Sequence, residues 1–412
     1  MIPTSIISIW FSGLLSLGII SGAIYLLREW SQTAWVYDGL LDKTVFNSDI
    51  GLNAPTALLA FGLLLLVWAV AGRLVVQLLL RLTSRHSPKD QPTRVRDGRI
   101  QRLRRPDGTE LQIEHYGLES GPALIFTHGW GTDSTAWYFL KRQLGDRFRV
   151  IVWDLPGVGK STRPPNGDYS LEKFAGDLDA VARLVDEEPV ILVGHSIGGM
   201  TTLTFCRLFP EALSTRVAGL VLVHTTYTNP VRTTTLARLN TALERPVIMP
   251  LLHLTIWLSP LVWAMNWLSY ANGTAHIFSR LTGFAGMETW QEVDFSSRYN
   301  LYLSPAVLAR GMFGMLRYDA SATLKTIDVP TLVVAGDRDP VCKPEASERI
   351  RRDVPTAEIT PLAPAKHMGF MEHNEEFAAL VGDFAGACFQ NAPAIRKAAR
   401  ADSVTILSSG AE

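Results

Sequence analysis

A serine framed by glycines is the residue with the most specific chemical signature in this chain. Residues 190–199 read VILVGHSIGG, and a largely apolar segment follows as far as Leu208. The first run predicts a buried strand and the second a helix, with the G-x-S-x-G form of a nucleophile elbow between them. Such a turn exposes the Ser196 hydroxyl at the carboxyl edge of a sheet, beside the partial positive charge of a helix N-terminus. An ordinary glycine-rich strand–helix turn is the alternative.

A serine nucleophile needs a base and an acid, and candidates for both follow it in the chain. The strand predicted over 331–335 runs into the sequence GDRD, which holds Asp337 and Asp339, and His367 follows the last short strand. A neutral imidazole takes the serine proton, and a carboxylate fixes the tautomer of the ring. Asp339 lies deeper in its loop than Asp337, and His373 falls where the final helix begins. We therefore expect Asp339 as the acid and His367 as the base.

Two backbone amides are candidates for stabilising an oxyanion. The sequence HGWG at 128–131 directly follows the apolar strand predicted over 123–127. Its glycines let the backbone turn so that an amide points at a bound substrate. The N–H of Trp130, together with that of Ile197 after the nucleophile, would form the oxyanion hole.

The elements that must position these residues alternate between strands and helices from residue 100 onward. This pattern is typical of a mostly parallel sheet flanked by helices, an α/β fold. No strand stands out within 225–320, so we expect a helical lid there, between two parts of one core at 100–224 and 321–390. The expected strands are 100–105, 109–116, 123–127, 149–153, 190–193, 219–224, 331–335 and a short one near 358; the expected helices are 134–144, 171–185, 200–208, 344–352 and 375–389.

Two apolar segments precede this core. The run from Ser5 to Leu27 has no charged residue, and a second, largely apolar run extends from Ala54 to Leu80. Both are long enough to cross a bilayer as helices. A signal peptide is the alternative for the first run, but it would need basic residues before the apolar segment, and residues 1–4 contain none. We expect residues 1–86 to be a membrane anchor with two transmembrane helices.

The flanking charges predict the orientation of this anchor. Residues 28–55 hold two basic residues against four acidic ones, whereas nine Lys or Arg residues lie within 81–105. Because basic flanks remain in the cytoplasm, we expect a two-pass membrane protein with a short outside loop and a cytoplasmic catalytic domain. Residues 87–99 are polar and predict a linker, and residues 391–412 are small and polar and predict a disordered tail.

Composition narrows the range of partners. The 39 Lys and Arg residues balance the 39 Asp and Glu residues, so nothing indicates a nucleic acid partner. The three cysteines, at 206, 342 and 388, show neither the spacing of a metal site nor a disulfide framework. We expect no metal site.

The middle of the expected lid, residues 246–270, is unusually apolar and aromatic. Its prolines and polar residues argue against a third membrane span. Buried lid core is one interpretation, and contact with an acyl chain or with the bilayer is the other, favoured by aromatic residues gathered over a catalytic pocket. Trp257, Trp263 and Met265 are therefore the candidate substrate-binding residues.

Taken together, these motifs resemble the α/β-hydrolase superfamily, in its lidded esterase and monoacylglycerol-lipase-like branch. The resemblance covers residues 100–389 and implies the α/β-hydrolase fold, a Ser196–Asp339–His367 triad, acyl-enzyme chemistry and no cofactor. Epoxide hydrolases and haloalkane dehalogenases of this fold carry aspartate at the elbow, where this chain has Ser196. The matching motifs are HGWG at 128–131, DLPGVGKS at 154–161, GHSIGG at 194–199, GDRD at 336–339 and KHMGF at 366–370.

The function expected from these observations is that of a membrane-anchored serine hydrolase. Its substrates would be carboxylic esters of apolar or lipid-like acids, and its partners a small-molecule or lipid ester and the bilayer. A thioesterase or acyltransferase, a cofactor-free perhydrolase with the same triad, and a catalytically silent membrane interaction module are the alternatives. The sequence leaves the oligomeric state open.

Overall fold

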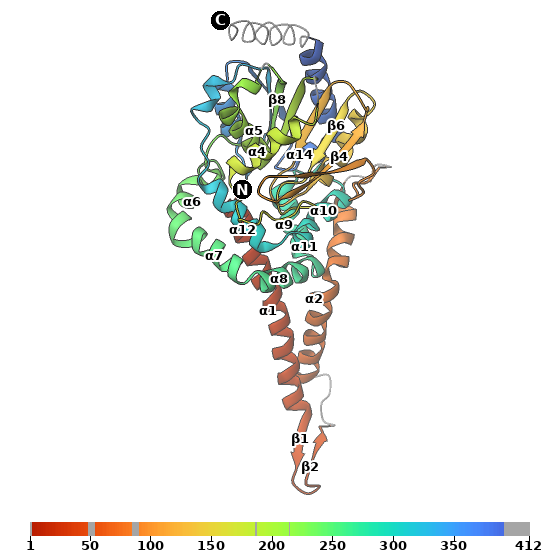
Figure 1. The fold of residues 1–412 in the computed structure, drawn as a ribbon. Coiled ribbons are helices and arrows are strands. Elements are labelled where there is room, and N and C mark those ends of the chain that lie inside the picture. Colours follow the sequence, from red (N-terminus) through yellow and green to blue (C-terminus); the bar gives the residue numbers. More distant parts are fainter. Residues whose placement is uncertain (1, 48–53, 85–89, 186–187, 214, 391–412) are drawn as a thin grey trace, which may run out of the picture.

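The protein consists of a globular body and a two-helix stalk that projects from it (Figure 1). The computed structural model describes residues 2–47, 54–84, 90–185, 188–213 and 215–390. The tail expected to be disordered, 391–412, and the first residues of the expected linker, 87–89, lie outside the described residues.

An eight-stranded sheet forms the centre of the body. Neighbouring strands from β10 to β6 are parallel, whereas β4 pairs antiparallel with both β6 and β3. This mostly parallel sheet, and the hairpin that begins it, are as expected from the sequence. In spatial order the strands are β10 (Ala357–Leu362), β9 (Thr331–Gly336), β8 (Val217–Val223), β7 (Val190–His195), β5 (Ala123–Thr127), β6 (Arg149–Trp153), β4 (Glu110–Gly117) and β3 (Arg99–Arg104).

Helices cover both faces of the sheet. Every residue of β5, β7, β8 and β9 is buried, which explains why these strands are continuous apolar runs without alternation. One face packs against α4 (Leu171–Ala182), α5 (Ile197–Leu208) and α13 (Pro344–Asp353). The other packs against α3 (Tyr138–Leu144) and the helical residues 374–390.

One expected core helix is divided. Residues Ser134–Trp137 form a 3-10 turn, η1, before α3 begins. The Asp133 carboxylate accepts a hydrogen bond from the Thr135 amide at 2.9 Å, which starts this tighter turn. The sequence pattern had predicted a single helix over 134–144.

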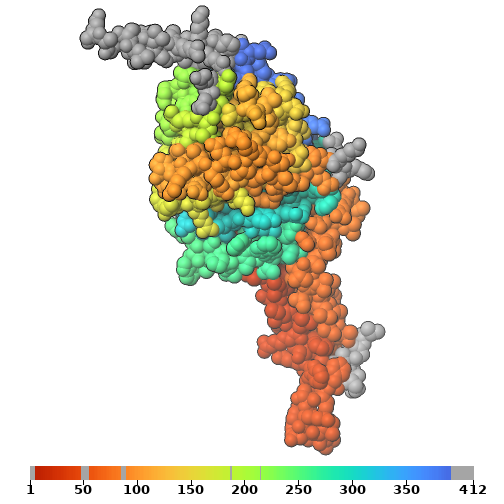
Figure 2. All heavy atoms as spheres, turned by 45° about the vertical axis from the view of Figure 1, so that its right-hand side comes forward, coloured from red at the N-terminus to blue at the C-terminus, as the bar shows by residue number. Residues whose placement is uncertain are grey.

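The lid lies between β8 and β9 and is helical, as predicted. Its two ends meet where the Ala320 N–H donates to the carbonyl of Tyr227 at 2.8 Å. In the space-filling view the lid lies between the sheet-bearing core and the stalk (Figure 2). Its helices are α6 (Ala237–Leu243), α7 (Met249–Trp257), α8 (Ser259–Ala271), α9 (Thr274–Gly283), α10 (Trp290–Ser297), α11 (Tyr299–Tyr302) and α12 (Pro305–Leu316), with a π-helical turn at Glu244–Ile248. Outside the lid, a short helix α14 (Gly369–Glu372) follows the last strand.

The stalk is made of α1 (Ile2–Ala34) and α2 (Ala54–Thr83), joined at its far end by the hairpin of β1 (Trp35–Asp38) and β2 (Lys43–Phe46) (Figure 1). Both helices are long and apolar enough to cross a membrane by length and composition. Two further segments among the described helices, Ala237–Trp257 and Ser259–Ala271, meet at a bend of 96°. They would be a third candidate membrane span only if they are counted as one span.

The stalk and the lid are packed together, which the sequence did not predict. The Trp10 indole of α1 donates to Thr255 Oγ1 at 2.9 Å, and a Cβ on Gly13 would collide with Met265 of α8. On α2, Gln77 donates to Asp294 Oδ1 of α10 at 3.0 Å. The N-terminal half of α1 and the C-terminal half of α2 therefore belong to the body of the protein, and only the remaining halves project from it.

Candidate active site

The turn between β7 and α5 holds Ser196 in a strained conformation. Its φ of +57° and ψ of −116° are rarely adopted by a residue with a side chain. The conformation is fixed by the Ser196 N–H, which donates to the Val223 carbonyl at 2.9 Å, and by the Thr225 hydroxyl, which donates to the Ser196 carbonyl at 2.6 Å. A side chain on Gly198 would collide with the carbonyl of Thr127, which explains the small residue there.

The residues predicted as nucleophile, base and acid are brought together at the carboxyl edge of the sheet. Ser196 Oγ lies 2.9 Å from His367 Nε2, and His367 Nδ1 lies 2.8 Å from Asp339 Oδ2. Each of the three residues follows a different strand, at the sheet edge where ligands of open α/β sheets bind. The arrangement lets the imidazole take the serine proton at one nitrogen while the carboxylate holds the other.

The Asp339 carboxylate is fixed and kept ionised. Its second oxygen accepts hydrogen bonds from the amides of Val341 at 2.7 Å and Cys342 at 3.0 Å. Burial alone would raise the pKa of Asp339, but the neighbouring His367 and His224 rings and the Cys342 amide together lower this pKa below its usual value. Asp339 is therefore positioned to orient His367 and to stabilise it when it is protonated.

The two alternative residues have different contacts. Asp337 Oδ1 accepts a hydrogen bond from the Ala365 amide at 2.7 Å, and His373 Nε2 donates to the Pro364 carbonyl at 2.9 Å. Both contacts hold the loop that carries His367.

The segment after β5 lies directly against the nucleophile. A Cβ on Gly129 would collide with the His195 ring and touch the Ser196 side chain. His128 Nδ1 donates to the Gly129 carbonyl at 2.8 Å, and its Nε2 accepts from the Leu155 amide at 3.0 Å, so this neutral ring fixes the segment.

This segment and the start of α5 carry the two amides expected at the oxyanion. Trp130 follows Gly129, and its indole donates to the carbonyl of Leu308 in the lid at 2.9 Å. Ile197 is the first residue of α5, where the N–H has no partner within the helix. Both amides are thus carried by segments in contact with Ser196, where they can stabilise negative charge on a bound carbonyl oxygen.

Two buried histidines next to the triad remain neutral. His195 Nε2 donates to the carbonyl of His367 at 3.0 Å, and burial with the nearby His367 and His224 rings lowers the pKa of His195 well below its usual value. His224 Nδ1 lies 3.8 Å from Asp339 Oδ2, and burial lowers the pKa of His224 to about 4. His224 was not among the residues predicted for the site, although it ends the strand predicted over 219–224 at the same sheet edge.

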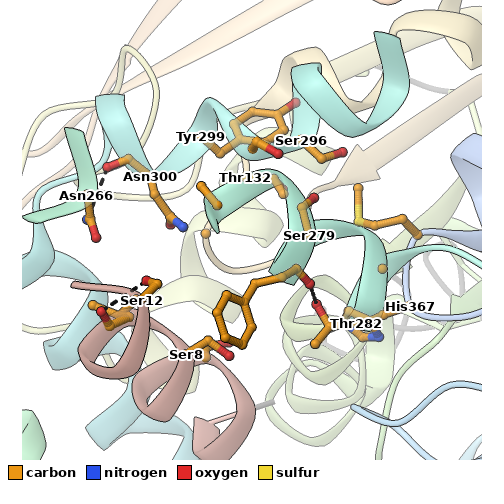
Figure 3. A pocket seen from close by; sticks show the side chains of 18 of the residues that line it. Ser8, Ser12, Thr132, Asn266, Ser279, Thr282, Ser296, Tyr299, Asn300 and His367 are labelled. Carbon is orange, nitrogen blue, oxygen red and sulfur yellow. Dashed lines mark hydrogen bonds between the residues drawn. The ribbon is translucent and has the colours of Figure 1, made fainter. Parts of the chain in front are cut away.

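A cavity of about 200 Å³ adjoins His367 beneath the lid (Figure 3). Its walls come from the HGWG segment, the loop of His367, the lid and, unexpectedly, α1. Figure 3 shows Ser8 and Ser12 of α1 around the same hollow as Ser279, Thr282 and His367. The lining residues are Ser5, Ser8, Ile9, Ser12, Trp130, Gly131, Thr132, Asn266, Ser269, Ala275, Phe278, Ser279, Thr282, Gly283, Ser296, Ser297, Tyr299, Asn300, Leu308, Val341, His367 and Met368.

The lid residues predicted to bind substrate lie elsewhere. Met265 is buried against Gly13 of α1, and Trp263 donates its indole N–H to the carbonyl of Leu301 at 2.8 Å. Trp257 is 78% exposed, because the bend between α7 and α8 turns it outward. None of the three lines the cavity beside His367. Among the residues that the structure describes, no group of three or more His, Cys, Asp or Glu side chains is arranged as a metal site.

Two curated relatives match this chain over most of the core. "Probable oxidoreductase EphD" of Mycobacterium tuberculosis is 28% identical over 297 residues, which are 68% of this chain but only 48% of that protein. This chain therefore spans about half the length of that relative. The pimeloyl-[acyl-carrier protein] methyl ester esterase of Methylococcus capsulatus is 29% identical over 276 residues, 64% of this chain and 94% of the relative.

Solved structures share the fold. An esterase from Exiguobacterium antarcticum superposes with a TM-score of 0.56 at 20% identity, covering 70% of this chain and 99% of its own. The esterase RhEst1 from Rhodococcus sp. ECU1013 gives a TM-score of 0.57 at 21% identity, with 70% and 99% coverage. The model of the alpha/beta hydrolase family matches residues 124–380, well over half of the chain. The expected fold is thus confirmed, and the chain belongs to the alpha/beta hydrolase family.

Proposed function

We propose that this protein is a membrane-anchored serine hydrolase that cleaves carboxylic esters of apolar or lipid-like acids through an acyl-enzyme intermediate. The observation that carries the proposal is the continuous hydrogen-bonded chain from Ser196 Oγ through His367 to Asp339, with distances of 2.9 and 2.8 Å, at the edge of a cavity.

The chemistry follows from this chain of hydrogen bonds. Ser196 Oγ attacks the ester carbonyl carbon while His367 Nε2 takes its proton, and the amides of Trp130 and Ile197 stabilise the oxyanion. His367 then protonates the leaving alcohol, which departs and leaves the acyl group on Ser196. A water molecule, deprotonated by His367, attacks the acyl-enzyme and releases the acid. Asp339 remains ionised throughout and stabilises the imidazolium.

The membrane position rests on the projecting part of the stalk. Residues 17–34 of α1 would span about 27 Å at about 1.5 Å per residue, close to the ~30 Å of a hydrocarbon core. Exposed apolar side chains lie on both stalk helices, among them Ile24 of α1 and Phe61 of α2 at 60% exposure each, and the exposed Arg28 lies toward the far end of the span, where a long side chain can reach the membrane interface. Trp257 at the end of α7 and Trp267 on α8 are exposed, and α8 packs against both stalk helices; exposed tryptophans beside a membrane span suit a membrane interface. The charge distribution favours a cytoplasmic body.

The ester class is supported by the relatives. The Methylococcus capsulatus relative is named as a methyl ester esterase, and the two structural neighbours are called esterases. The apolar character of the acyl group is inferred from the membrane stalk.

Labelling by a fluorophosphonate probe tests the nucleophile. The parent protein should be labelled and Ser196→Ala should not, with ester turnover lowered by up to about a million-fold. Labelling that persists in Ser196→Ala, or more than a few per cent of parental activity, would contradict the proposal.

A series of p-nitrophenyl esters from C2 to C12 tests the acyl group. Each methylene that enters an apolar site contributes about 0.8 kcal/mol, so kcat/KM should rise about fourfold per methylene before it levels off. A flat profile would refute the lipid-like acyl group while leaving the ester chemistry intact.

A further inference from the structure

The N-terminal half of α1 is built into the lid by polar contacts. Ser16 Oγ lies 3.1 Å from Ser269 Oγ of α8, and Asn272 Nδ2 donates to Ser16 Oγ at 2.8 Å. Serines recur at 5, 8, 12 and 16, a spacing that places them on one side of the helix. This side faces the lid and the cavity beside His367, so an otherwise apolar helix presents hydroxyl groups to the candidate active site.

The cavity wall is uncharged and carries many hydroxyl and amide groups among its apolar side chains. Its hydroxyl and amide groups come from α1, α8, α9 and the segment around α11, and include Ser8, Ser12, Asn266, Ser279 and Asn300 (Figure 3). None of the described residues that line it is Asp, Glu, Lys or Arg. An ionic group placed there would lose its hydration without gaining a counter-ion, which is strongly unfavourable. The occupant is therefore neutral.

Several of these hydroxyls have already used their proton. Ser12 donates to the carbonyl of Ile9 at 3.3 Å, Thr282 to that of Phe278 at 2.8 Å, and Thr132 to that of Gly129 at 2.8 Å. A hydroxyl that donates to its own backbone retains lone pairs with which it accepts hydrogen bonds. The wall is thus rich in acceptors, and its complement is a ligand with several O–H donors.

The hydroxyl groups of this wall also bear on which half of an ester the cavity takes. A hydrocarbon chain in this space would cover the hydroxyl lone pairs without replacing their hydrogen bonds to water, which costs free energy at every group.

We propose that this cavity binds the alcohol half of the substrate, that this half is an uncharged sugar or other polyol, and that Ser8 and Ser12 of the anchor helix contact it. The inference rests on the ester hydrolysis proposed above. It makes α1 a substrate-binding element as well as a membrane anchor.

The test compares three octanoyl esters with the same acyl group: 6-O-octanoylglucose, methyl octanoate and octanoylcholine. With the detergent-solubilised full chain, kcat/KM for the glucose ester should exceed that for the methyl ester about tenfold, and the cationic choline ester should be the poorest substrate. The double variant Ser8→Ala/Ser12→Ala should lower the glucose-to-methyl ratio about tenfold. Ser21→Ala, the same change at an exposed position of α1, should leave the ratio unchanged.

The outcomes separate the two proposals. A parent protein that neither reacts with a fluorophosphonate nor cleaves any ester contradicts the proposed hydrolase function. A parent that cleaves the methyl ester as well as the glucose ester, or a double variant with an unchanged ratio, overturns the polyol site alone. Folding of the double variant is checked by its fluorophosphonate labelling rate. Ser8→Thr, which keeps a hydroxyl, should retain more of the parental ratio than Ser8→Ala, and the reverse order also counts against the site.

Discussion

Replacing Glu292 by glutamine is expected to stabilise the protein at pH 8 and to change its stability far less at pH 5. Glu292 lies in α10 of the lid and is 2% exposed. Burial, assisted by the nearby carboxylates of Glu372 and Glu288, raises its pKa from 4.5 to about 7. Its hydrogen bonds with Thr289 oppose this increase but do not cancel it.

The sign of the effect follows from proton binding. Between pH 4.5 and about 7 the folded state holds a proton on Glu292 that the unfolded chain has lost, so the free energy of unfolding falls as pH rises through this window. At about 1.4 kcal/mol per pKa unit, the difference between 4.5 and about 7 lowers the free energy of unfolding by about 3 kcal/mol above pH 7. Below pH 4.5 this cost is absent.

Glutamine removes the charge but keeps the local hydrogen bonds. Glu292 Oε2 accepts from the Thr289 amide at 2.8 Å in a capping box, a position where glutamine serves equally well. At about 2–4 °C per kcal/mol, Glu292→Gln should raise Tm by about 6–12 °C at pH 8. Glu372, whose pKa burial also raises, is present in both proteins, and its repulsion of Glu292 is lost in the variant and is part of this difference. Thermal unfolding at pH 5 and pH 8 provides the measurement, with the exposed Glu119→Gln as control. An equal Tm change at both pH values would refute the reasoning.

Three further predictions concern the triad, its neighbour and the topology. Asp339→Asn should lower kcat by about 10⁴-fold, because asparagine would hold His367 in the wrong tautomer. Asp337→Asn weakens only the contact with the Ala365 amide and should lower kcat far less. Steady-state kinetics on one ester compare the two variants, and similar losses of kcat would contradict the assignment of Asp339 as the acid. His195→Asn should lower kcat by less than Asp339→Asn and leave the pH profile of kcat unchanged, because His195 remains neutral; a displaced acidic limb would contradict this. Leu40 is 98% exposed at the tip of the hairpin. In intact cells the variant Leu40→Cys should react with an impermeant maleimide, whereas the buried native cysteines should not. Protection of Leu40→Cys from the reagent would invert the predicted topology.

Much of the core could be read from the sequence because its determinants are local. Strands buried on both faces must be continuous apolar runs, and the predicted 123–127 and 149–153 coincide with β5 and β6. Residues with reactive side chains at the carboxyl ends of such strands meet at one edge of the sheet, whatever the length of chain between the strands. For that reason Ser196, Asp339 and His367 could be predicted to meet across more than 170 residues of chain.

The lid could not be read in the same way, because the direction of an aromatic side chain depends on tertiary bends. The junction between α7 and α8 turns by 96°, and this angle decides that Trp257 faces outward while Met265 faces α1. Both residues lie in one apolar run, and nothing in their spacing distinguishes a side chain that lines a cavity from one that packs on a neighbouring helix or faces a bilayer.

The role of α1 was hidden for a different reason, which also bears on how the protein works. Serine scarcely interrupts a hydropathy window, so four serines on one side of the helix leave the run from Ser5 to Leu27 indistinguishable from a plain membrane span. The helical spacing of these serines was the available sign that one side of the helix is polar. The two halves of α1 have different surroundings: the first contacts the lid through Trp10 and Ser16, and the second presents many apolar side chains. A single straight helix therefore ties the position of the proposed membrane span to the wall of the cavity, so any tilt of the stalk against the body must move Ser8 and Ser12 relative to His367.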